Sequence, residues 1–243
     1  MQMPTNSSRI DPVARESQVI AFLDHFPRDL SPILIGGYAI AAYGPPRFSV
    51  DVDLVLPRDM GAMARSWFKE EGVDCRETMG VKGAAGPISK LLISRGLVSG
   101  DIYLGGLRAR ESGVIVPYEQ IARKPTTDRL PLTTGSTQAP FPVARPEALW
   151  VLKLLAGRPE DLTDLFVISE RSVDSSEISS MLSALSGRQV TSHLRSVASR
   201  LDSDKEYRDA LSRRGLGSPT DAKNQKLWAK FKRQALGYLS SYL

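Results

Sequence analysis

Hydrophobic and polar positions change their spacing near the middle of the chain. In the first half, apolar residues come in short blocks or alternate with polar ones, and only a few stretches have helical spacing. The first helix is predicted after Asp11, a good N-cap, with Pro12 in its first turn. A further helix is expected at 60–71, with Asp59 as its cap. Strands are predicted at 32–35, 50–56, around Val73, 88–94 and 98–104.

The second half has a helical pattern from Pro146 to the end. Strands mixed with helices, followed by helices alone, predict an α/β domain followed by an all-helical domain. The boundary is expected in the Thr-, Pro- and Gly-rich stretch 133–146, so we divide the chain into 1–140 and 141–243. The last helix carries an apolar stripe that predicts a core face, made of Trp228, Phe231, Ala235, Leu239 and Tyr242.

Composition narrows the class of protein. With 42% hydrophobic and 24% charged residues, the 243-residue chain is typical of a soluble globular protein. No apolar run approaches the roughly 20 residues that cross a bilayer, and the polar start lacks a signal-peptide core. We therefore expect a cytoplasmic protein without membrane contact. Cys75 is expected to be buried, and with His25 and His193 it offers too few ligands for a Cys/His zinc site, so oxygen atoms would hold any metal.

The net charge of +5 is concentrated at the C-terminal end. Residues 203–243 hold nine Lys and Arg against four Asp and Glu, and the residues before them balance. Clustered cations attract a polyanion such as RNA. A solvated helix face explains the same pattern, and both interpretations stay open.

Two short features could carry chemistry. Asp51 and Asp53 are two residues apart on a predicted strand, so both carboxylates should share one face. Such a pair is stable around a hard cation, and Mg²⁺ prefers one or two carboxylates plus phosphate oxygens. Gly36 and Gly37 lie between a predicted strand and the predicted helix 38–43, where backbone N–H groups can approach a phosphate. The Gly-rich segment 80–86 lacks a P-loop ending and predicts a hairpin loop.

The segment Ile35-Gly-Gly-Tyr-Ala39, followed by Gly44-Pro-Pro-Arg47-Phe-Ser49-Val-Asp51-Val-Asp53-Leu54, resembles DNA polymerase β-type nucleotidyltransferases. Within that superfamily it looks most like the AbiEii/AbiGii-type toxin nucleotidyltransferases, whose segment reads Gly-Gly, a short helix, then Gly-x-x-Arg-x-Thr-x-Asp-x-Asp. Ser49 stands where Thr is usual, and the hydroxyl is retained.

A second match lies in the helical half. The helix 146–156 with Lys153, followed by Arg158-Pro-Glu-Asp161-Leu-Thr-Asp164-Leu165, resembles the family's lysine-bearing helix and its Arg-x-Lys-Asp-x-x-Asp-Leu segment. Glu160 replaces the usual Lys. Lys153 and Arg158 can offer positive charge to phosphate oxygens, whereas Asp161 and Asp164 share a helix face and can contact a base or orient Lys153.

The resemblance implies a polymerase β-like domain, with a mixed sheet and flanking helices, and transfer of a nucleoside monophosphate from an NTP to an acceptor hydroxyl. It implies Mg²⁺ or Mn²⁺ on Asp51 and Asp53, with Asp101 as candidate third carboxylate, either a metal ligand or the base for the acceptor hydroxyl. Gly36, Gly37 and Ser49 would hold phosphates, and Arg47, Lys153 and Arg158 would stabilise developing charge. Asp161 and Asp164 complete the expected catalytic set.

The acceptor stays open at this level. RNA, in particular tRNA, fits a toxin of a toxin–antitoxin or phage-defence system, with a cognate antitoxin protein as a further partner. A small molecule of the antibiotic type is the alternative acceptor. The third alternative is a nucleotide-binding protein without turnover, which has less need for two metal ligands on one face.

Overall fold

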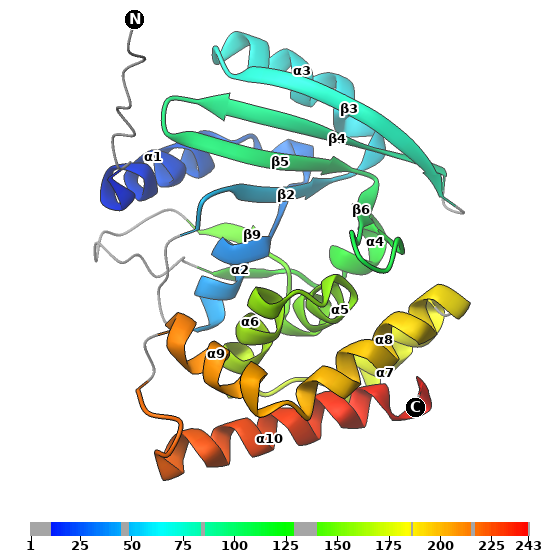
Figure 1. Cartoon of the computed structure of the whole chain (residues 1–243). Helices are drawn as coiled ribbons and strands as arrows, with labels where there is room; N and C mark the ends of the chain where they lie inside the picture. The colour runs from blue at the N-terminus through cyan, green and yellow to red at the C-terminus, as the bar shows by residue number, and fades with distance from the viewer. Residues whose placement is uncertain are drawn as a thin grey trace, which may run out of the picture.

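A strongly twisted sheet and a layer of helices make up the computed structural model (Figure 1). The structure describes residues 11–44, 49–83, 86–128, 140–185, 187–214 and 217–242. Arg47 therefore lies outside the described residues.

Within these residues, seven strands form one mixed sheet in the order β3-β4-β5-β2-β1-β9-β8. The pairs β2–β5 and β1–β9 are parallel and the other neighbours antiparallel. The last strand in the chain, β9, falls just past residue 140 and still belongs to this sheet. The strands are β1 (Ile33–Ile35), β2 (Val52–Leu56), β3 (Asp74–Gly83), β4 (Gly86–Arg95), β5 (Val98–Leu104), β8 (Thr126–Asp128) and β9 (Phe141–Val143).

Short helices and a small hairpin accompany the sheet. After β5, Gly105 and Gly106 have φ of 79° and 143°, values that favour glycine, and they turn the chain out of the sheet. The hairpin of β6 (Gly106–Arg108) and β7 (Ile115–Pro117) follows. The helical elements here are α1 (Pro12–His25), the 3₁₀ turns Arg28–Leu30 and Arg58–Met60, α2 (Gly36–Tyr43), α3 (Gly61–Glu70) and α4 (Tyr118–Ile121).

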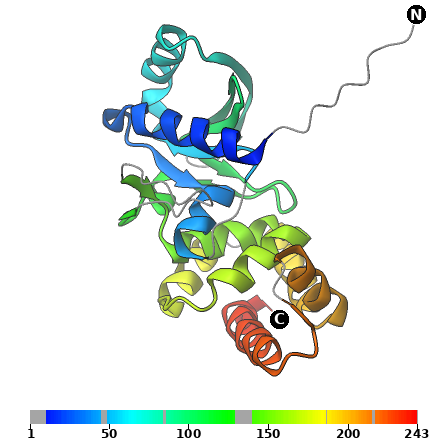
Figure 2. The same ribbon diagram turned by 90° about the vertical axis from the view of Figure 1, so that its left-hand side faces the viewer.

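The C-terminal region is helical, as predicted. Its elements are α5 (Pro146–Ala156), α6 (Pro159–Ile168), α7 (Ser175–Ala184), α8 (Arg188–Leu201), α9 (Asp204–Arg214), α10 (Ala222–Leu239) and the turn Ser240–Tyr242. Helix α2 lies between the sheet and α5 and α6 (Figures 1 and 2). One continuous apolar core runs from the sheet into the helices. The mixed sheet with flanking helices, followed by helices, confirms the expected fold class.

The predicted core stripe on the last helix is confirmed. Trp228, Phe231, Ala235, Leu239 and Tyr242 are all buried. Helix α10 packs on α6, α7 and α8, and both ribbon views place it farthest from the sheet (Figures 1 and 2). No described helix has the length and apolar character needed to span a membrane.

Helix α1 is capped by Asp11, whose side chain accepts from the Val13 N–H, as predicted. Three other local predictions are wrong. The cap of α3, however, is Met60, because Asp59 belongs to the 3₁₀ turn before it. Cys75 is exposed on the edge strand β3. Asp51 precedes β2, since pairing with β5 begins only at Val52.

Candidate active site

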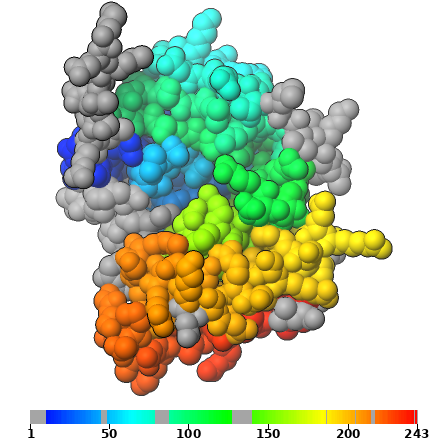
Figure 3. All heavy atoms as spheres, in the orientation of Figure 1, coloured from blue at the N-terminus to red at the C-terminus, as the bar shows by residue number. Residues whose placement is uncertain are grey.

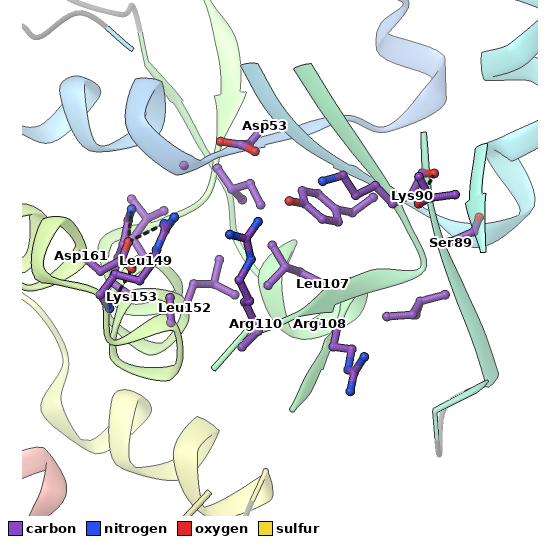
Figure 4. A pocket seen from close by; sticks show the side chains of 18 residues that line it. Asp53, Ser89, Lys90, Leu107, Arg108, Arg110, Leu149, Leu152, Lys153 and Asp161 are labelled. Carbon is purple, nitrogen blue, oxygen red and sulfur yellow. Dashed lines mark hydrogen bonds and ion pairs between the residues drawn. The ribbon is translucent and has the colours of Figure 1, made fainter. Parts of the chain in front are cut away.

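A cavity of about 400 Å³ lies between the sheet and helices α5 and α6 (Figure 4). Gly36 and Asp53 line it from β1–α2 and β2, and Lys153 and Asp161 line it from α5 and α6. Further lining residues come from β4, β5 and the β6–β7 hairpin. On the face in Figure 3, the green segment that contains this hairpin lies where the sheet and the helices meet. The cavity therefore combines residues from both halves of the chain.

Gly36 brings Asp53 against the N-terminus of α2. Asp53 is paired in register with Ile35, the residue before Gly36. Gly36 has a φ of 69°, and a Cβ at this position would lie 2.0 Å from Oδ2 of Asp53. A side chain at residue 36 would therefore displace the Asp53 carboxylate from this position.

Asp53 is a crowded carboxylate. Burial raises its pKa to about 7, and the negative charges of Asp101 and Asp51 contribute, while Lys153 and Lys90 act in the opposite direction. Asp53 and Asp101 are directly in register on the parallel strands β2 and β5. The charges of Asp101 and Asp51 thus disfavour ionisation of Asp53.

The two other predicted carboxylates are held by neighbours. Asp51 accepts a 2.5 Å hydrogen bond from Oγ of Ser99. Oδ2 of Asp101 lies 2.5 Å from Nζ of Lys90 and accepts a 3.1 Å hydrogen bond from the Tyr103 hydroxyl. Burial, followed by the charges of Asp53 and Asp101, raises the pKa of Tyr103 above its usual range. The phenol therefore stays protonated and can keep donating.

A second charged cluster faces Asp53 across the cavity. Nζ of Lys153 lies 2.8 Å from both Asp161 Oδ1 and Asp164 Oδ2, and all three residues are buried. Arg158 donates from Nε to Asp161 at 2.7 Å. Burial alone would raise the pKa of Asp161, but the hydrogen bond from Arg158 and the charge of Lys153 outweigh it and hold this pKa below the usual range. Asp161 is therefore ionised.

Helix ends position this cluster. Gly157, at φ 64°, ends α5 four residues after Lys153. Pro159 begins α6, and Asp161 accepts from the Arg158 backbone N–H at 3.2 Å, which caps the helix. Both Asp161 and Asp164 orient Lys153, one of the two roles predicted from their spacing.

Several of the other predicted residues do not line the cavity. Ser49 donates from Oγ to the Asp51 carbonyl at 3.3 Å, and its own carbonyl accepts from the Tyr38 hydroxyl. Among the described residues, the wall includes Gly36 but not Gly37, Ser49, Asp51 or Asp101.

Sequence reasoning missed Lys90 and Tyr103, and also Arg108 and Arg110 on the hairpin, all of which line the cavity. Lys90 and Tyr103 are opposite each other in the β4–β5 register. Alternation along β5 from Asp101 could have pointed to Tyr103. For the hairpin arginines the sequence held no signal beyond the glycines at Gly105 and Gly106.

Known proteins add little to this geometry. No protein-family model matches the chain, and no curated protein matches it. A solved structure of a candidate nucleotidyltransferase from H. pylori is similar over 96% of each chain, with 14% sequence identity and a TM-score of 0.45. A functional interpretation therefore rests on the residues of the cavity.

Proposed function

We propose that the protein is a nucleotidyltransferase that moves a nucleoside monophosphate from an NTP to an acceptor hydroxyl and releases pyrophosphate. One observation carries the proposal. The Asp53 carboxylate, flanked by Asp51 and Asp101, faces the buried Lys153 and the partly exposed Arg158 across a cavity large enough for a small ligand. Acidic groups opposite cations suit a phosphorylated substrate that brings its own divalent cation.

The carboxylates fit a divalent cation. Among the described residues, no three His, Cys, Asp or Glu side chains are grouped as ligands for a metal ion. Mg²⁺, however, needs only one or two carboxylates, with phosphate oxygens and water completing its shell. Burial, followed by the charge of Asp101, raises the pKa of Asp53, and a bound cation would offset both effects. We propose Asp51 and Asp53 as ligands and Asp101 as the third carboxylate; the ion would neutralise charge on the transferred phosphate.

The chain's own residues then position the substrate. Nζ of Lys153 has three N–H donors, and two are directed to Asp161 and Asp164. The third remains for a phosphate oxygen, with Arg158 beside it on the same wall. Because two buried carboxylates fix the ammonium, little side-chain entropy is lost when the substrate binds.

In the proposed transfer, the acceptor oxygen forms a bond to the α-phosphorus. The P–O bond between the α-phosphorus and the bridging oxygen breaks, and pyrophosphate leaves with that oxygen. Asp101 is the proposed base for the acceptor proton. Its ion pair with Lys90 must loosen as the proton transfers, and Tyr103 keeps the carboxylate oriented.

For the acceptor we favour RNA, and with it a toxin role and a cognate antitoxin; an antibiotic-type small molecule is the alternative. Exposed cations on α10, among them Lys226, Lys230 and Arg233, offer a surface for a polyanion. Helix α10 lies at the far end of the helical layer from the sheet (Figure 1). An RNA that uses both surfaces must therefore be large, as a tRNA is.

The test is incubation with each labelled NTP, Mg²⁺ and total RNA, followed by separation of labelled RNA, protein and small molecules. Asp51→Asn and Asp53→Asn should each abolish transfer without unfolding the protein. Glu71→Gln is the matched control, since Glu71 is an exposed carboxylate paired with Arg95 outside the cavity. Unchanged transfer in either Asn variant, or no labelled product with any NTP, would contradict the proposal.

A further inference from the structure

The cations in the cavity wall are not equally available to a ligand. Of the five cations among the described lining residues, three are engaged by carboxylates: Lys90 by Asp101, and Lys153 and Arg158 by Asp161, with Asp164 also on Lys153. The other two, Arg108 and Arg110, come from the β6–β7 hairpin.

The hairpin holds its arginines in a defined place. Its turn is closed by two backbone hydrogen bonds of 2.8 Å, from Ala109 N–H to the Val114 carbonyl and from Gly113 N–H to the Ala109 carbonyl. Ala109 is buried, which anchors the turn. At the base, Gly106 approaches so closely that a Cβ would lie 2.5 Å from the Val116 carbonyl oxygen. A side chain on this turn is therefore presented from a rigid support.

The two arginines point in different directions. Arg108 donates from Nε to the Gly113 carbonyl at 3.4 Å, and its guanidinium is turned away from Asp53 (Figure 4). Arg110 extends from the turn into the cavity toward Asp53. It lies near enough to Tyr103 to favour the ionised phenolate electrostatically. Within the described part of the chain, Arg110 makes no hydrogen bond or ion pair.

We infer that Arg110 binds the β- and γ-phosphates of the triphosphate, the part that leaves as pyrophosphate; this inference rests on the proposed function. A guanidinium fork matches two phosphate oxygens at once. Among the residues that the structure describes, neither hairpin arginine has a carboxylate that competes for its donors, but only Arg110 points toward Asp53 (Figure 4). Lys153 and Arg158 line the same cavity from the helical region. A polyphosphate chain would thus be held between the hairpin and the α5–α6 cluster.

Inorganic tripolyphosphate tests this without assuming a base or an acceptor. Its affinity for the full chain is measured calorimetrically in buffer with Mg²⁺, for the wild type, Arg110→Ala, Arg110→Lys and Arg108→Ala. We expect a loss of about 10- to 100-fold in Arg110→Ala, as for a hydrogen bond to a charged group. The Lys variant should lose less because it retains the charge. Arg108→Ala, on the same hairpin, should stay within about twofold, since its guanidinium points elsewhere.

Equal affinity of Arg110→Ala and the wild type for tripolyphosphate would overturn the inference. Equal losses of affinity in Arg108→Ala and Arg110→Ala would also overturn it, as would the absence of tripolyphosphate binding by the wild type. Labelled-NTP transfer is scored separately. Transfer by the wild type with Arg110-independent tripolyphosphate binding overturns only the inference. Arg110-dependent binding without transfer of any label supports the polyphosphate site and overturns the proposed function.

Discussion

Asp53→Asn should stabilise the protein in the absence of metal, although it removes a proposed catalytic group. Burial and neighbouring carboxylates raise the pKa of Asp53 from 3.8 to about 7 in the folded protein. The folded state therefore holds the proton more tightly than the unfolded state. This stabilisation is complete below pH 3.8 and is lost as the pH rises through about 7.

The magnitude follows from the two pKa values. At 1.36 kcal/mol per pKa unit, the raised pKa of Asp53 destabilises the folded protein, relative to low pH, by about 2 kcal/mol at pH 5 and by about 4 kcal/mol at pH 8. An Asn side chain has no such pH-dependent cost. The advantage of Asp53→Asn in free energy of unfolding should therefore grow by about 2–3 kcal/mol between pH 5 and pH 8, whatever constant effect the amide itself has.

Urea denaturation at both pH values, with EDTA present, measures this growth. Glu71→Gln is the matched control, because it is also a carboxylate-to-amide change but lies outside the cavity, where Glu71 pairs with Arg95. The growth with pH should be specific to Asp53→Asn. In the wild type, Mg²⁺ should stabilise more at pH 8 than at pH 5, by linkage, and Asp53→Asn should lose that response. An Asp53→Asn advantage that is equal at both pH values would refute the reasoning.

Two further perturbations test the helical region. Lys153→Ala should lower the free energy of unfolding by about 3–5 kcal/mol, since Asp161 and Asp164 lose a buried partner, and should abolish transfer. Lys153→Arg should retain folding and partial transfer. Wild-type stability and transfer in the Ala variant would exclude a role for Lys153 in binding phosphate. Neutralising Lys226, Lys230 and Arg233 together should weaken RNA binding and flatten its log–log salt dependence by about 0.7–0.9 per lost phosphate contact, without changing NTP binding. An unchanged slope in filter-binding assays would favour the small-molecule acceptor.

Local sequence spacing predicted part of the site well. Gly36 and Asp53 come together because a short strand, a glycine turn and a short helix are followed by a strand that pairs back on the first. The contacts among Lys153, Arg158 and Asp161 are equally local, since the end of one helix and the cap of the next lie within nine residues. Both arrangements depend on turns and caps whose residue preferences are strong.

The rest depends on long-range packing. Lys90 reaches Asp101 only through the antiparallel register of β4 and β5. Arg110 reaches the cavity because two glycines turn the chain out of the sheet after β5. Cys75 is exposed since β3 is an edge strand, a position in the strand order that the sequence does not show. The features that sequence reasoning missed therefore depend on strand order and on the direction of the hairpin, which local residue preferences do not specify.

Two carboxylates that face the same cavity are perturbed in opposite directions, and this difference separates their roles. Asp161 is buried with two cations, which hold its pKa low, so its charge is neutralised by the protein itself. Burial, followed by the charge of Asp101, raises the pKa of Asp53, so this carboxyl holds its proton more tightly than an ordinary Asp. Asp161 belongs to the scaffold that fixes Lys153. A cation bound at Asp53, as we propose, would offset the cost of ionising it, which is the property that a metal-dependent phosphoryl-transfer site needs.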